Sequence, residues 1–208
     1  MSPPDSGRKV FLHIYDVGGS SVVKHMNDTL RRFGTGVYHT GIEVYGQEWS
    51  FAIRLNADME PQEGCGITIS VPCQDPCHAY RESVLLGETD LSGSQVSRIL
   101  CDMLPEWRSE KYDLLTNNCQ TFCHELSKHL QVNPPPAWVT SAAAAGLNLT
   151  GGAATTQKHA CRSSSCSSST SCSSPTSTVV PIDAWNGTVI SIDAWKSDCN
   201  EICTGVSI

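Results

Sequence analysis

The stretch "YDLLTNNCQTFCHELSKHL" spans residues 112–130 and joins a helix start signal to an apolar stripe. Asn118 directly precedes Cys119, and asparagine is favoured before a helix because its side chain accepts a hydrogen bond from a first-turn N–H. Apolar residues follow Cys119 at helical spacing, at positions +3, +4, +7 and +11. They are Phe122, Cys123, Leu126 and Leu130. The stretch therefore predicts a buried amphipathic helix that begins at Cys119.

Cys119 is the candidate nucleophile of the chain. At the first position of a helix its thiol meets unpaired N–H groups and the positive end of the helix dipole. We expect this environment to favour the thiolate, which is the nucleophilic form of cysteine. Cys123 lies one turn further along the apolar stripe, and Cys101 lies on the apolar face of another predicted helix, so both are expected to be small core residues.

A thiol that attacks a carbonyl also needs a base, and the chain offers seven histidines. His39 opens a predicted strand and precedes Gly41, whose small size leaves room beside the imidazole. His13 lies in an apolar run and is expected to be a core or edge residue, while His124 points away from Cys119 on the same helix. A cysteine and a histidine 80 positions apart still leave the catalytic interpretation open.

The residues before about position 147 alternate apolar runs with turn signals, which predicts an α+β domain because strands and helices are mixed without strict alternation. Strands are predicted at 9–17, 38–52 (two strands joined at Gly46–Gln47) and 80–90, and helices at 20–34 and 92–107. The prolines of "PPPAW" (134–138) are predicted to end the helix that begins at Cys119.

Composition divides the chain into three parts. Residues 1–8 are predicted to be disordered, 9–147 to form the compact domain, and 148–208 to form a flexible tail rich in serine and cysteine. Near its end the tail repeats Ile-Asp-Ala-Trp, which places Trp185 and Trp195 in equivalent positions. This repeat is either part of a weakly ordered tail or a motif that docks on a partner.

Charge and cysteine content exclude several classes of protein. The net charge is −7 and no basic block is present, so nucleic acid is not an expected partner. No run of about 18 apolar residues is present, so no transmembrane segment is expected. The eleven cysteines are an odd number and no secretory signal is visible, which favours mostly reduced thiols in a cytoplasmic and/or nuclear protein.

Five segments in this order resemble the PPPDE peptidase family, also called desumoylating isopeptidases. They are "VFLHIYDV", "YHTGIEVYGQEWSFA", "YRESVLLGETDLS", "YDLLTNNCQTFCHEL" and "PPPAW", and together they extend over residues 9–147. The resemblance implies a papain-like, permuted cysteine peptidase fold, in which a small antiparallel sheet packs with helices. In this fold the catalytic histidine precedes the cysteine along the chain.

The resemblance also assigns the two site residues. The histidine of the family's His-Thr/Ser-x-Ile motif falls on His39, and the cysteine of its Asn-Cys-Asn-x-Phe motif falls on Cys119. Family members use this dyad without an evident third carboxylate, and no cofactor or metal is implied. Gln120 departs from the family pattern, which more often has Asn or His after the nucleophile, so local contacts are expected to differ there.

The activity that the resemblance implies is removal of SUMO or ubiquitin from lysine side chains, so conjugated proteins are the expected partners. Two alternatives stay open. The same dyad can hydrolyse palmitoyl thioesters, an activity that is also associated with the family. The domain can otherwise be a non-catalytic binding module with structural zinc, for which the segment 64–80 offers cysteine and histidine ligands. These ligands are Cys65, Cys73, Cys77 and His78.

Overall fold

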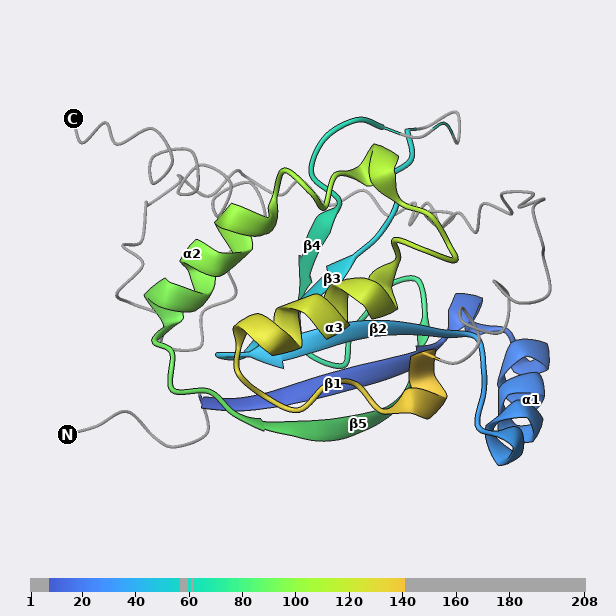
Figure 1. Ribbon diagram of the computed structural model, residues 1–208. Coiled ribbons are helices and arrows are strands. Elements are labelled where there is room, and N and C mark those ends of the chain that lie inside the picture. Colours follow the sequence, from blue (N-terminus) through green and yellow to red (C-terminus); the bar gives the residue numbers. More distant parts are fainter. Residues whose placement is uncertain (1–7, 57–59, 61, 141–208) are drawn as a thin grey trace, which may run out of the picture.

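The computed structural model describes residues 8–56, 60 and 62–140, which form an antiparallel sheet covered by helices (Figure 1). The strand order is β4-β3-β2-β1-β5. The strands are β1 (Lys9–Asp16), β2 (Tyr38–Val44), β3 (Gln47–Phe51), β4 (Ile67–Ser70) and β5 (Ala79–Glu88). The helices are α1 (Ser21–Leu30), α2 (Gly93–Met103) and α3 (Cys119–His129), with 3-10 turns η2 (Val17–Gly19), η3 (Arg31–Phe33) and η4 (Ser109–Lys111). The predicted α+β class is confirmed.

Helix α3 lies across one face of the sheet (Figure 1), and the core of the domain is between them. All four residues of its predicted apolar stripe are completely buried. They pack with the inward-facing residues of the central strands, among them Leu12, Ile14, Ile42 and Trp49. Burial of this stripe therefore determines which face of α3 meets the sheet, as the helical spacing predicts.

Strands β2 and β3 form a tight hairpin whose turn residues are Tyr45 and Gly46. Val44 pairs with Gln47, so only two residues connect the strands. Both turn residues have positive φ, 54° for Tyr45 and 72° for Gly46, which is the backbone that a type I′ hairpin requires. The predicted junction at Gly46–Gln47 is thus displaced by one residue, because Gln47 already belongs to the ladder.

Helix α3 ends before the prolines that were predicted to end it. Gln131 adopts a left-handed backbone with φ 61°. Its N–H donates to the Lys128 carbonyl (3.1 Å), and the Val132 N–H donates to the Ser127 carbonyl (3.1 Å). These two bonds form a Schellman motif, which satisfies the last carbonyls of a helix. The chain therefore leaves the helix at Leu130 without help from the prolines.

Two further predictions of secondary structure need correction. Strand β4 was not predicted, because the cysteines and glycines around its four residues hide a short edge strand. Helix α2 ends at Met103 and not at 107, since the residues after it turn at Pro105, which cannot continue a helical hydrogen-bond ladder.

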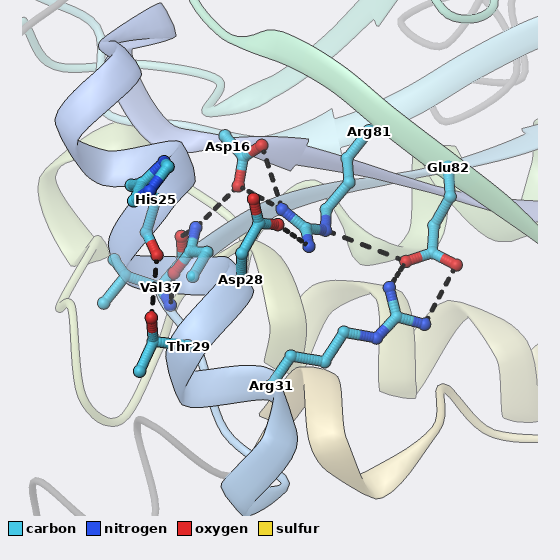
Figure 2. A network of polar contacts seen from close by, with 9 residues as sticks. Asp16, His25, Asp28, Thr29, Arg31, Val37, Arg81 and Glu82 are labelled. Atoms are coloured by element: carbon cyan, nitrogen blue, oxygen red, sulfur yellow. Dashed lines mark hydrogen bonds and ion pairs between the residues drawn. The ribbon is translucent and has the colours of Figure 1, made fainter.

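A network of polar contacts fastens α1 to strands β1 and β5 (Figure 2). Asn27, on the helix, donates to Asp16 of β1 (2.7 Å). Arg81 of β5 contacts the same carboxylate (3.1 Å) and also donates to Asp28 of α1 (2.5 Å). Asn27 is a weak helix former, but here it is fully buried and holds the helix by tertiary hydrogen bonds.

The same network reaches Tyr38, the first residue of β2. The guanidinium of Arg81 lies 5.6 Å from the centre of the Tyr38 ring. Trp138, from the "PPPAW" segment, packs edge-to-face against the Tyr38 ring, with the ring centres 5.5 Å apart. The Arg31 guanidinium lies over the Trp138 ring, 4.2 Å from its centre. Tyr38 is thus held by groups from β5, η3 and the C-terminal segment, and this position matters for the site.

The second face of the sheet is polar and is covered by the segment between β4 and β5. Directly paired residues of neighbouring strands point to the same face. Tyr15 pairs with His39, and Gly41 pairs with both His13 and Ser50, so the side chains of His13, Tyr15, His39 and Ser50 all point to this face. Gly41 also belongs here, and a Cβ at this position would lie 2.4 Å from a carboxylate oxygen of buried Glu48. The space expected beside His39 is therefore occupied by the Glu48 side chain.

Candidate active site

Asn118 caps α3 as predicted. Its side-chain oxygen accepts hydrogen bonds from the backbone N–H groups of Gln120 (2.9 Å) and Thr121 (3.1 Å). In return, the Thr121 hydroxyl accepts the backbone N–H of Asn118 (2.8 Å), which completes a capping box. The Asn118 amide also donates to the Leu114 carbonyl (2.8 Å). Cys119 is therefore the first residue of a helix whose start is fixed both by the capping box and by the bond from Asn118 to the preceding loop.

This helix start is docked on the backbone of β2. The Gln120 amide donates to the Tyr38 carbonyl (3.1 Å), and the Cys119 sulfur lies 4.0 Å from the same oxygen. The Thr40 backbone also contacts the Cys119 thiol. Tyr38 and Thr40 flank His39 in the chain. Thr40 faces α3, whereas the His39 side chain points to the opposite face of the sheet, beside Tyr15. The structure thus brings the Cys119 thiol to the backbone of β2 but does not bring it into contact with the His39 imidazole, whose partners are on the other face.

Burial dominates the electrostatics of the Cys119 thiol. It raises the pKa of Cys119 above the ordinary cysteine value, although hydrogen bonds from Thr40 and Tyr112 act in the opposite direction. The prediction that the helix start favours a thiolate is therefore wrong for the isolated protein, because loss of solvation outweighs the helix terminus. The pKa of Tyr112 is raised too, mainly by burial, so its hydroxyl stays protonated beside the sulfur.

His39 is buried among polar partners on the second face of the sheet. Its Nε2 lies 3.0 Å from the Ser50 hydroxyl oxygen and 3.8 Å from a carboxylate oxygen of Asp75. The His78 ring packs against it with centroids 4.4 Å apart. Burial, with a smaller contribution from His78, lowers the pKa of His39 to about 3, so the imidazole is neutral at physiological pH.

The hydrogen-bond network assigns the tautomer of His39. The Ser50 hydroxyl donates its proton to the Thr40 carbonyl (2.7 Å), so its oxygen accepts from His39. Neutral His39 therefore carries its proton on Nε2, and Nδ1 has the free lone pair. An imidazole in this state can act as a base through Nδ1.

Sequence reasoning missed Ser50, Asp75, His78 and Tyr112 as neighbours of the two candidate residues. Asp75 is notable because no third carboxylate was expected. Its other oxygen accepts the backbone N–H groups of Cys77 and His78 (both 2.8 Å), which orients the carboxylate toward His39. The segment "PCQDPCHAY" (72–80) did signal a site through its density of functional side chains, but it was interpreted as a source of zinc ligands.

The four side chains of the alternative zinc site have separate partners. Cys73 faces His13 at 3.5 Å, His78 accepts the Gly18 N–H (3.1 Å), and the Cys65 thiol lies 3.5 Å from the Ile67 carbonyl. Within residues 8–56, 60 and 62–140, no group of three His, Cys, Asp or Glu side chains could hold a metal ion. The structure therefore does not assemble these residues into the zinc site that the spacing suggested.

The cysteines of the described segments are of two kinds. Cys77 and Cys101 are disulfide-bonded. Free thiols are found at Cys65, Cys73, Cys119 and Cys123. The expectation was of mostly reduced thiols, and four of these six cysteines are free while two are disulfide-bonded. Cys101 lies in the core as predicted. Cys123 is a completely buried core residue, also as predicted.

A comparison with protein families identifies the class. The model described as the PPPDE putative peptidase domain matches residues 8–160, which is most of the chain. The matched domain is described as a peptidase, and peptidases as a class are hydrolases that act on peptide-type bonds. More narrowly, the chain belongs to the PPPDE peptidase family, as the five sequence segments indicated.

Three curated relatives support the same assignment. The chain is 28% identical over 147 residues to the desumoylating isopeptidase 1 homolog of Caenorhabditis elegans, covering 68% of this chain and 39% of the relative. DeSI-like proteins of Arabidopsis thaliana and Schizosaccharomyces pombe are 29% and 30% identical over 137 and 139 residues. These alignments cover 66% and 67% of this chain, and 56% and 66% of the relatives. The chain therefore spans less than two thirds of these relatives' own lengths.

Two predictions on the chain ends lie beyond what the structure describes. The predicted tail begins at residue 148, and its tryptophans Trp185 and Trp195 fall outside the described residues.

Among the residues that are described, no helix is long and apolar enough to span a membrane.

Loss of the Asn118 cap should destabilise the domain. We expect Asn118→Ala to lower the free energy of unfolding by about 1–2 kcal/mol, because two first-turn N–H groups lose their acceptor. Asn117→Ala is the matched control, since the Asn117 amide makes one exposed bond to the Lys111 carbonyl. Urea unfolding curves of both variants measure the difference. Equal losses in the two variants would show that the cap does not stabilise α3.

The raised pKa of Cys119 should appear in its reactivity. We expect the rate of Cys119 alkylation by iodoacetamide to keep rising up to about pH 9 and beyond, because only the thiolate reacts. Peptide mass spectrometry of the intact chain follows this residue separately from the other cysteines. A rate that is constant from about pH 5 to pH 8 would instead indicate a preformed thiolate–imidazolium pair and would contradict a raised pKa for this thiol.

Proposed function

We propose that this chain is a cysteine-type isopeptidase that removes a ubiquitin-like modifier, SUMO or ubiquitin, from lysine side chains. Cys119 is the nucleophile and His39 is the base in this proposal. The observation that supports it is the capped start of α3, which holds the Cys119 thiol on β2 beside Thr40 and Tyr112. The role of His39 rests on the family motif, because its side chain is on the opposite face of the sheet in this structure. The names of the relatives, which include a desumoylating isopeptidase, support the choice of substrate class.

The proposed reaction begins with a neutral thiol and a neutral imidazole. Both groups start neutral, because the pKa of Cys119 is raised and that of His39 is lowered. The proposal requires the His39 ring, which faces the other side of the sheet in this structure, to reach the thiol, so that its Nδ1 takes the proton as the sulfur attacks the isopeptide carbonyl. His39 then gives this proton to the departing lysine amine, and a thioester joins the modifier to Cys119. Water, deprotonated by His39, hydrolyses the thioester and restores the thiol.

Asp75 and Ser50 have a positioning role in this scheme. Both lie at Nε2 of His39, so they hold the ring with Nδ1 as the proton-accepting nitrogen. The Asp75 carboxylate at 3.8 Å also stabilises the imidazolium that forms during the attack. Asp75 thus supplies the third group that orients a catalytic base, although the family motifs do not identify one.

Tyr112 is the side chain that the proposal assigns to the oxyanion. The negative oxygen of the tetrahedral intermediate forms next to the sulfur, and the Tyr112 hydroxyl interacts with that sulfur and stays protonated. The backbone N–H of Cys119 at the helix start contacts the Tyr112 hydroxyl oxygen in the structure, so it is a second donor only when the oxyanion replaces that contact. Together they form a pair of donors of the kind that stabilises acyl-transfer intermediates.

Modifier probes with an electrophile at the C-terminus test the proposed function. We expect a SUMO or ubiquitin probe to form a covalent adduct with the intact chain, and Cys119→Ser to abolish it. We expect His39→Ala to slow cleavage of a conjugate at least about 100-fold, the usual contribution of a general base. Cys123→Ser is the matched control and should keep activity, because this thiol is buried packing one turn along α3.

The same experiment separates the alternatives. An adduct that persists in Cys119→Ser would overturn the assignment of the nucleophile. If every modifier probe and conjugate fails while a palmitoyl thioester is hydrolysed in a Cys119-dependent manner, the dyad stands and the isopeptidase activity is refuted. No turnover of either substrate class by a folded protein would favour a non-catalytic binding module.

Tyr112→Phe tests the oxyanion assignment. We expect kcat for conjugate cleavage to fall about 100- to 1,000-fold, as when one donor of an oxyanion hole is removed, with KM little changed. Tyr45→Phe is a suitable control, because the Tyr45 hydroxyl donates to the Leu91 carbonyl and is not at the site. An unchanged kcat in Tyr112→Phe would assign the oxyanion to backbone groups alone.

A further inference from the structure

The polar face of the sheet contains a second thiol beside a histidine. Cys73 Sγ lies 3.5 Å from His13 Nδ1, and His13 Nε2 lies 2.7 Å from a carboxylate oxygen of Glu43. A thiol, an imidazole and a carboxylate in this order are the groups of an activated cysteine. They come from three separate segments: the connection after β4, strand β1 and strand β2. Neither Cys119 nor His39 is among them.

The tautomer of His13 suits the role of a base. The Glu43 carboxylate accepts a proton from Nε2, so in neutral His13 the lone pair is on Nδ1, the nitrogen nearer the Cys73 thiol. The His13 side chain is almost completely buried, which holds the ring in this orientation. The Ser83 hydroxyl also lies 2.7 Å from Nδ1 and competes with the thiol for it.

The backbone of Cys73 is strained in a way that holds the thiol in place. Its φ is 63°, a left-handed conformation that a residue with a Cβ rarely adopts. The Cys73 N–H donates to the buried Glu48 carboxylate (3.0 Å), and the Tyr15 hydroxyl donates to the same oxygen (2.6 Å). The residue is only partly buried, in contrast to Cys119 and Cys123.

The position of Glu48 disfavours acyl transfer at Cys73, because it occupies the nearest backbone donor. An attacked carbonyl would need N–H donors for its negative oxygen, but the N–H of Cys73 is already bonded to a carboxylate. Attack on a sulfur atom develops no such oxygen. In thiol–disulfide exchange the negative charge passes to the leaving sulfur instead.

We propose that Cys73, His13 and Glu43 form a second reactive centre, which undergoes thiol–disulfide exchange with low-molecular-weight disulfides such as glutathione disulfide. The Cys73 proton passes to His13 Nδ1, and the sulfur attacks one sulfur of the disulfide. The S–S bond of the disulfide breaks, a Cys73–glutathione bond forms, and the leaving thiolate takes the proton from His13. One glutathione is released and Cys73 is reversibly modified.

The rate of mixed-disulfide formation at each cysteine tests the proposal. The full chain is incubated with glutathione disulfide, remaining thiols are blocked, and peptide mass spectrometry gives the modified fraction of each cysteine over time. We expect Cys73 to react at least about tenfold faster than Cys65, which is also a partly buried free thiol but contacts a backbone carbonyl. Equal rates at the two cysteines would overturn the proposal.

Three variants identify the groups responsible. His13→Gln should reduce the Cys73 rate to that of Cys65, and Glu43→Gln should reduce it several-fold while the Cys65 rate stays unchanged. Ser83→Ala should raise the Cys73 rate, because Nδ1 then faces the thiol alone. If Ser83→Ala instead slows Cys73 as strongly as His13→Gln, the serine is the partner of the base and the proposal fails.

Labelling of buried Cys123 in the same samples reports unfolding, since a folded chain protects this thiol. If Cys123 becomes labelled in His13→Gln, that variant is unfolded and its Cys73 rate cannot be interpreted. The Glu43→Gln variant then tests the role of the carboxylate, because it keeps the shape of the side chain and changes only its charge. An unchanged Cys73 rate in Glu43→Gln would then refute the centre. Repeating the series in Cys119→Ser separates the result from the proposed isopeptidase activity, which that variant lacks.

Discussion

The site depends on the contact between the start of α3 and the backbone of β2. Asn118 holds the first turn of the helix, and Gln120 and Cys119 then meet the Tyr38 carbonyl. Tyr38 is itself held by Arg81 and Trp138, so groups distant in sequence determine where that carbonyl lies. A helix anchored in this way cannot slide along the sheet. The position of its first residue is consequently set to within a fraction of a helical turn.

Burial has opposite effects on the pKa values of the two candidate residues, and this determines the resting state of the site. It raises the pKa of Cys119 and lowers that of His39, so neither is charged in the isolated protein. A neutral pair is less reactive toward adventitious electrophiles than a thiolate would be. In the proposed reaction, proton transfer is coupled to attack on a bound substrate, whose carbonyl provides the charge acceptor.

Much of the fold and part of the site could be predicted from the sequence, because those features are local. The cap at Asn118, the buried stripe of α3 and the extent of β1 follow from spacing and side-chain chemistry over a few residues. What could not be predicted depends on contacts distant in sequence. The pKa of Cys119 was misjudged because helix position is visible in the sequence but burial is not. Asp75 was overlooked as a neighbour of His39 because 36 residues separate them and only the folded connection after β4 brings them together.

The two faces of the sheet give their buried polar groups different surroundings: Cys119 and Cys123 lie on the α3 side, whereas His39 and His13 lie on the opposite side. The face toward α3 is apolar and buries its thiols in hydrocarbon, which suppresses ionisation of Cys123 and raises the pKa of Cys119. The other face is covered by a connecting segment, and its buried charges bond to one another: Glu48 accepts from the Tyr15 hydroxyl and from the Cys73 backbone. Gly41 permits this arrangement, because any Cβ there would displace Glu48. The glycine beside the family histidine is therefore required by the packing of Glu48 on the polar face.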